Sequence, residues 1–139
     1  MSPLGAWAED DDGVILISPE NMRWQKWGKS QRTMLFGNPD DFDCPYVDRV
    51  KFPAGYKVDG HAFQQDKEFT VISGVVLVGI GHTWDESKLQ SLPAGSFWRI
   101  PAGVSYYFRA ESEVLMQTST REVPGRDCST GRREVVKPS

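Results

Sequence analysis

The fold is decided by two stretches of sequence, GYKVDGHAFQQDKEFTVISG at residues 55–74 and GSFWRIPAGVSY at residues 95–106. Apolar and polar side chains alternate in both, as they do from Glu68 to Val71. Alternation with a period of two is typical of a half-buried β-strand. Glycine and proline interrupt the runs, at Gly74 and Pro101 for example, where tight turns need them. The two stretches therefore indicate short strands joined by turns.

The same pattern extends outward over residues 13–120. The predicted strands are Gly13–Ile17, Met22–Trp27, Arg32–Phe36, Tyr46–Phe52, Tyr56–Val58, His61–Phe63, Glu68–Ser73, Val75–Ile80, Ser96–Ile100, Ser105–Ala110 and Glu113–Thr120. The one helix-like stretch, Glu86–Gln90, is about a turn long. Short strands at this spacing are typical of a small sandwich or barrel, so the predicted fold class is all-β.

The composition fits one domain. The chain has 139 residues, 39% of them hydrophobic, and a formal net charge of −3, which offers no basic surface for nucleic acid. No apolar run is long enough to cross a membrane, and the first residues do not resemble a signal peptide. We expect an acidic, flexible N-terminus at 1–12, a β-barrel at 13–122 and a polar tail at 123–139, in a cytoplasmic protein.

The two cysteines, Cys44 and Cys128, lie far apart and form no C-x-x-C motif. Two cysteines do not make a disulfide framework, so we expect free thiols in a reducing compartment. The alternative is a bridge that pins the C-terminal tail.

Residues 52–118 resemble the cupin superfamily, the RmlC-like jelly rolls. The family's first motif is Gly, five residues, His-x-His, three or four residues, Glu, about six residues and Gly, which Gly55, His61 and Gly74 match in spacing. Its second motif is Gly, five residues, Pro-x-Gly-x-x-His, which Gly95 and Pro101 match. The resemblance implies a double-stranded β-helix, that is, a jelly-roll barrel, and points to a subgroup of single-domain cupins of mostly undefined function.

The metal ligands of the family are mostly replaced. His61 keeps the first ligand, but Phe63 stands at the second histidine, Lys67 at the glutamate and Tyr106 at the last histidine. Two donors are fewer than the three or four that a metal site uses. We therefore expect no metal and no other cofactor. A bulge that turned Glu68 inward would restore a third donor, and this alternative stays open.

Strand alternation predicts what fills the barrel instead. Lys67 shares its face with Phe69 and Val71, and Tyr106 shares its face with Val104 and Phe108, while Ser105 and Tyr107 point outward. On the last strand either Val114, Met116 and Thr118 or Leu115 and Gln117 face inward, the first set being more apolar. The predicted catalytic residues are His61, Lys67 and Tyr106, and the predicted substrate-binding residues are Phe63, Phe69, Trp98, Phe108 and Met116.

This interior favours a metal-independent enzyme that acts on a small molecule by acid–base chemistry next to a carbonyl group. His61 would be the general base, and Lys67 or Tyr106 the acid or the stabiliser of the oxyanion. The reaction would be of isomerase, dehydratase or cyclase type, as in secondary metabolism, on an aromatic or carbonyl-bearing substrate. The alternatives are a non-catalytic cupin that binds a small ligand and a metallo-cupin oxygenase with an unusual site.

We expect a homodimer, and no nucleic-acid or membrane partner. The segments Val14–Ile17 and Met22–Trp27 are apolar enough to make an exposed sheet edge a liability, and pairing across a two-fold axis would cover it.

Overall fold

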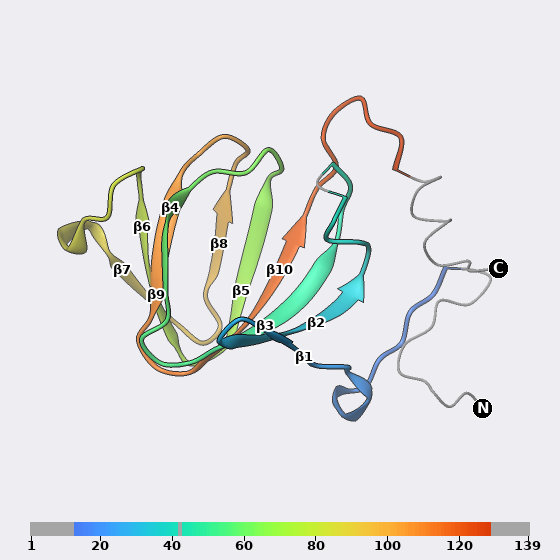
Figure 1. The fold of residues 1–139 in the computed structure, drawn as a ribbon, viewed down its shortest axis with the longest axis horizontal. Coiled ribbons are helices and arrows are strands. Elements are labelled where there is room, and N and C mark those ends of the chain that lie inside the picture. Colours follow the sequence, from blue (N-terminus) through green and yellow to red (C-terminus); the bar gives the residue numbers. More distant parts are fainter. Residues whose placement is uncertain (1–12, 42, 129–139) are drawn as a thin grey trace.

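The structure, a computed structural model, describes residues 13–41 and 43–128 and consists of two antiparallel sheets (Figure 1). One sheet has six strands in the order β1-β2-β3-β10-β5-β8, and the other has four in the order β4-β9-β6-β7. The strands are β1 (Gln25–Trp27), β2 (Ser30–Phe36), β3 (Val47–Phe52), β4 (Lys57–His61), β5 (Lys67–Ser73), β6 (Val75–Ile80), β7 (Gln90–Pro93), β8 (Phe97–Ile100), β9 (Tyr106–Ala110) and β10 (Val114–Thr120). The predicted all-β jelly-roll barrel is confirmed.

Alternate side chains of each strand form the core between the two sheets. On β10 the buried positions are Val114, Met116 and Thr118, the more apolar of the two predicted sets. On β5 they are Lys67, Phe69 and Val71, as predicted. β10 pairs with both β3 and β5, and these three strands form the middle of the six-stranded sheet.

Some predicted elements differ from the structure. Gly13–Ile17 is not a strand: within it the structure has an isolated bridge at Ile15, and Leu16 is exposed. The predicted strand His61–Phe63 does not form, since His61 is the last residue of β4. β7 was not predicted because Gln90–Pro93 is mostly polar. It is the outer strand of its sheet and pairs with β6 alone. Within Glu86–Gln90, only η2 (Glu86–Lys88) is helical.

The face of the chain that carries Ser105 and, on β9, Tyr107 is covered by other residues rather than exposed to solvent. Both residues are buried, and the Tyr107 hydroxyl donates to the carbonyl oxygen of Asp85 at 3.2 Å. Gly79 makes room for this ring, because a Cβ at that position would lie 2.2 Å from the ring of Tyr107. The ring of Trp84 also packs against Tyr107, with the two ring centroids 4.9 Å apart.

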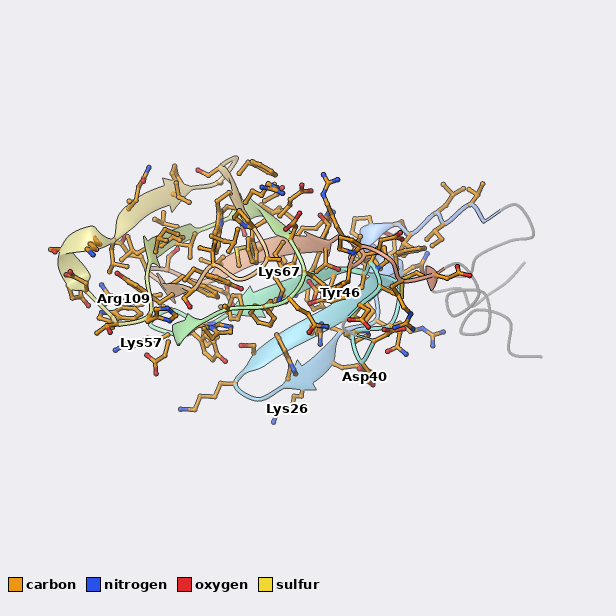
Figure 2. The ribbon with its side chains drawn as sticks, turned by 90° about the horizontal axis from the view of Figure 1, so that it is seen from above. Lys26, Asp40, Tyr46, Lys57, Lys67 and Arg109 are labelled. Carbon is orange, nitrogen blue, oxygen red and sulfur yellow. A yellow bond between two sulfur atoms is a disulfide. The ribbon has the colours of Figure 1, made fainter. Side chains whose placement is uncertain are left out.

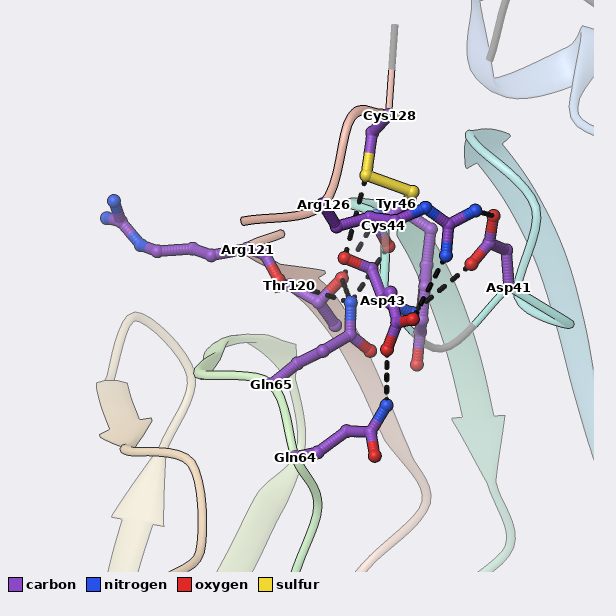
Figure 3. The surroundings of a disulfide bond; sticks show 10 residues. All are labelled: Asp41, Asp43, Cys44, Tyr46, Gln64, Gln65, Thr120, Arg121, Arg126 and Cys128. Atoms are coloured by element: carbon purple, nitrogen blue, oxygen red, sulfur yellow. Dashed lines mark hydrogen bonds and ion pairs between the residues drawn. A yellow bond between two sulfur atoms is a disulfide. The ribbon is translucent and has the colours of Figure 1, made fainter. Parts of the chain in front are cut away.

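Cys44 and Cys128 form a disulfide, so the expectation of free thiols is wrong and the alternative of a bridge is confirmed (Figure 3). The bridge joins the loop before β3 to the segment after β10, and the two cysteines have a sequence separation of 84. The prediction of a cytoplasmic protein loses the support it drew from free thiols and stays a prediction. No helix in the described part of the chain is long and apolar enough to cross a membrane.

Polar contacts hold the same two segments together around the bridge (Figure 3). The Arg126 guanidinium donates to the carboxylates of Asp41 and Asp43, at 3.0 Å each. The buried amide of Gln65 donates to the carbonyl oxygens of Cys44 and Arg121, at 2.8 and 3.1 Å. The first part of the predicted tail, residues 123–128, is therefore attached to the barrel. The predicted flexible N-terminus at 1–12 and the rest of the tail lie outside the described residues.

β1 is an edge strand whose three residues are all exposed. This agrees with the reasoning that an unpaired edge lies near Trp27, but nothing in the structure tests the homodimer, which stays a prediction.

Candidate active site

A pocket of about 290 Å³ lies between the two sheets. It is lined from both, by β2, β3, β5 and β10 on one side and by β4 and β9 on the other. Figure 2 shows two of its residues, Lys67 and Tyr46, within the body of the molecule, while Lys26 lies at its outer edge. The aromatic residues of its wall are Trp27, Tyr46, Phe52, Tyr56, Phe63, Phe69, Tyr106 and Phe108.

His61 is placed on the pocket wall at the end of β4. The preceding residue, Gly60, has to be small, because a Cβ there would lie 2.4 Å from the carbonyl oxygen of His82. The Nδ1 atom of His61 lies 2.7 Å from the carbonyl oxygen of Asp59. A carbonyl oxygen only accepts, so Nδ1 carries the proton and donates it. The Nε2 atom of neutral His61 therefore has a free lone pair and can act as a base.

Lys67 points into the pocket from the first position of β5. Its side chain is 7% exposed, and Nζ lies 3.2 Å from the centroid of the Phe63 ring. Burial lowers the pKa of Lys67 to about 8, against the opposing attraction of Asp48. The next residue, Glu68, faces outward and pairs with Arg121 at 2.7 Å. The strand is thus in the predicted register, and the alternative that turns Glu68 inward is ruled out.

Tyr106 is the first residue of β9, and its ring packs against those of His61 and Phe69. Its ring centroid is 5.2 Å from that of His61 and 5.8 Å from that of Phe69. Burial raises the pKa of the phenol well above its usual range. Its hydroxyl has no hydrogen-bond partner among the residues that the structure describes. Tyr106 is therefore a neutral donor at physiological pH, not a base.

Four of the five predicted substrate-binding residues line the pocket: Phe63, Phe69, Phe108 and Met116. The fifth, Trp98, does not. It is the cross-strand partner of Phe69, and the two rings stack with centroids 3.9 Å apart. Trp98 supports a wall residue and does not face a ligand.

Sequence reasoning missed a charged pair on the pocket wall. The Arg32 Nε atom donates to Oδ2 of Asp48 at 2.8 Å, and Asp48 is almost fully buried. Burial raises the pKa of Asp48, although Arg32 and Lys67 oppose the shift. Burial and the charge of Asp48 also raise the pKa of Tyr46 to about 12. The sequence does contain a signal for Asp48. It stands two residues before Val50 and four before Phe52, so the alternation of β3 places all three side chains on the same buried face.

The residues at the metal-ligand positions of metal-bearing cupins do not fit a divalent cation. His61 supplies one nitrogen, and Tyr106 is a neutral phenol. Lys67 brings a positive charge that lies on the phenyl ring of Phe63. In residues 13–41 and 43–128 no three His, Cys, Asp or Glu side chains come together as a possible metal site. We therefore derive no chemical step through a metal.

The two-sheet barrel with its pocket has the cupin fold, and structures of known proteins agree. An RmlC-like cupin from Shewanella frigidimarina matches with a TM-score of 0.63 at 16% identity, over 78% of this chain and 90% of that one. KdgF from Halomonas sp. matches with a TM-score of 0.60 at 16% identity, over 76% and 93%. An oxalate decarboxylase from B. subtilis matches with a TM-score of 0.57 at 13% identity, over 77% of this chain and 29% of that one. At these identities the likeness shows the fold alone.

The chain belongs to the family described as a domain of unknown function, DUF4437, whose model matches residues 40–131. None of the curated proteins matches the sequence. The matched region includes the pocket residues of β3, β4, β5, β9 and β10 but begins after Arg32 on β2.

Proposed function

We propose that this cupin is a metal-independent enzyme that moves a proton next to a carbonyl group of a small substrate. The observation that carries the proposal is that His61 and Lys67 both pack against the ring of Phe63 on the pocket wall. The Phe63 ring has Nζ of Lys67 3.2 Å from its centroid and the ring of His61 at 4.6 Å. A base and a buried cation that face one small cavity are the two groups that enolisation needs.

The chemistry follows from the state of each group. The free Nε2 of His61 takes the proton from the carbon beside the carbonyl, and the electrons of that C–H bond pass to the carbonyl oxygen. The ammonium of Lys67 stabilises the oxyanion, an effect typically worth roughly 3–4 kcal/mol for one donor. The phenol of Tyr106 donates a second hydrogen bond, and the aromatic wall holds the apolar body of the substrate. Return of the proton to another carbon atom gives an isomerisation. Its transfer to a β-hydroxyl group, which leaves as water when the C–O bond breaks, gives a dehydration, and attack of the enolate carbon on a second carbonyl carbon of the same molecule, whose oxygen takes the proton, gives a cyclisation.

The proposal is tested by proton exchange, which needs no knowledge of the final product. Small aromatic ketones and oxo acids are incubated with the protein in D₂O, and loss of the α-proton signal is followed by NMR. We expect catalysed exchange with the wild type and a rate about 100-fold lower in His61→Ala and in Lys67→Met. Glu68→Gln is the matched control, because Glu68 lies beside Lys67 but pairs outside the barrel with Arg121.

Two results would contradict this function. One is the absence of exchange with every compound of the panel. The other is exchange that survives in both His61→Ala and Lys67→Met, which would place the chemistry elsewhere.

The pH dependence gives a further readout of Lys67. Its pKa is lowered to about 8, so the ammonium form is present below that pH and is lost above it. The charged and titratable groups that line the pocket with it are Arg32, Asp40, Tyr46, Asp48, Tyr56, His61 and Tyr106. We expect exchange to decline as the pH rises through about 8. Lys67→Arg should remove this decline, because a guanidinium keeps its proton.

The metallo-cupin alternative has its own test. Because Phe63, Lys67 and Tyr106 replace metal ligands, we expect purified protein to contain well below one equivalent of iron, zinc, manganese, nickel or copper. Elemental analysis of several preparations measures this directly. Stoichiometric metal together with exchange that a chelator abolishes would favour the metallo-enzyme instead.

A further inference from the structure

Arg32 is a firmly held cation on the pocket wall. Its Nε atom donates to Asp48, and its guanidinium carbon lies 4.4 Å from the ring centroid of Trp27 and 5.6 Å from that of Tyr46. These contacts hold the planar group in place. Its two terminal nitrogens hydrogen-bond to none of the described residues. A guanidinium held in this way keeps N–H groups for an anion, and its geometry suits a carboxylate.

Lys67 is a second cation without an acceptor. No oxygen atom in the described part of the chain accepts a hydrogen bond from its Nζ or lies within ion-pair distance of it. Its named contact is the face of Phe63. Lys67 lines the pocket, so its ammonium can meet a group that the pocket holds. An anionic group in the pocket would supply that acceptor.

We propose that Arg32 and Lys67 bind the carboxylate of the substrate, so that the pocket takes small carboxylic acids with an apolar or aromatic body. The ammonium of Lys67 has three N–H donors, so it can donate to this carboxylate and also to the carbonyl oxygen that becomes the oxyanion. The inference rests on the proposed function and deepens it, because it names the class of substrate from which the proton next to the carbonyl group is removed. The carboxylate lies beside Arg32 and Lys67, and the apolar body lies against aromatic residues of the wall such as Phe52 and Phe108.

The charge of the pocket favours a monoanion. A half-buried cation, Arg32, and a buried one, Lys67, face one buried carboxylate, Asp48, so this part of the wall carries one excess positive charge. The other acidic residue of the lining, Asp40, is exposed to water. One carboxylate balances this charge, whereas a phosphate dianion would exceed it. The volume of about 290 Å³ limits the body to the size of a small molecule.

The test compares two probes of one shape, phenylacetate and its neutral amide phenylacetamide. Each is titrated into the full chain near neutral pH and low ionic strength, and binding is followed by NMR. We expect phenylacetate to bind about tenfold more tightly or better. We expect Arg32→Gln and Lys67→Met to remove the preference. Arg49→Gln is the matched control, because Arg49 donates to Gln117 and does not line the pocket.

Arg32→Gln leaves Asp48 without its partner and can fail to fold. The double variant Arg32→Gln/Asp48→Asn removes both charges together and keeps groups that can hydrogen-bond, and it should also lose the preference. Equal affinities of the wild type for the two probes, or binding of neither in the millimolar range, would overturn the inference. So would a preference that survives in both Lys67→Met and the double variant.

The binding test separates this inference from the proposed function. His61→Ala should keep the preference for phenylacetate while losing proton exchange. Preference without exchange in the wild type would support the carboxylate site and contradict the enzyme, leaving a cupin that binds acids. Exchange of neutral ketones without a carboxylate preference would support the enzyme and overturn the inference.

Discussion

Replacing Asp48 by alanine is expected to lower the free energy of unfolding by roughly 3–5 kcal/mol, the usual effect of removing one partner of a buried ion pair. Asp48 is 2% exposed and accepts from Arg32 at 2.8 Å. Without it, Arg32 and Lys67 remain on a buried wall with no opposing charge. Urea unfolding of the wild type and of Asp48→Ala measures the change. The free energy of unfolding should fall with urea concentration at the same slope in both proteins, which shows that unfolding exposes the same surface in each.

Two further variants serve as comparisons for Asp48→Ala. Glu86→Gln breaks an exposed ion pair with Arg109 and should change stability far less than Asp48→Ala. Arg32→Met/Asp48→Leu replaces the whole pair by apolar groups and should recover most of the loss, because the desolvation of both charges disappears. If Asp48→Ala unfolds at the wild-type urea concentration, the pair does not stabilise the barrel.

Breaking the disulfide is expected to lower the free energy of unfolding by roughly 2–5 kcal/mol. The bridge joins Cys44 to Cys128 across a sequence separation of 84 residues, and a cross-link over a long loop removes much entropy from the unfolded chain. Unfolding of the oxidised protein, of the reduced protein and of Cys44→Ser/Cys128→Ser measures the effect. The reduced protein and the serine variant should agree.

The serine variant also serves as the control for the reductant, which should not change its stability. Equal stability of oxidised and reduced wild type would show that Arg126 and Gln65 hold the two segments together without the bridge.

Local alternation was enough to place the residues on β5 and β9. Lys67 points inward and Glu68 outward because successive side chains of a strand face opposite sides. The same rule placed Tyr106 and Phe108 on the wall of the pocket. Phe63 and His61 could be placed because the glycines and prolines around them match those of cupins in spacing.

Trp98 shows where alternation stops being informative. It is buried on the expected strand, as the pattern requires, but Phe69 stacks on it and it does not line the pocket. The period of a strand decides which face a side chain takes, and not whether a neighbouring ring lies between it and the cavity. The packing of β5 against β8 decides that.

The sequence by itself determined most of the strands, the inward face of the long strands and the loss of the metal ligands, because these depend on residue spacing within single segments. The tertiary structure alone decided that Arg32 meets Asp48, which requires the register of β2 against β3, and that Cys44 meets Cys128. Both contacts join segments that no local period relates. The positions of charges relative to one another across the barrel, and hence the electrostatics of the pocket, follow from how the sheets close.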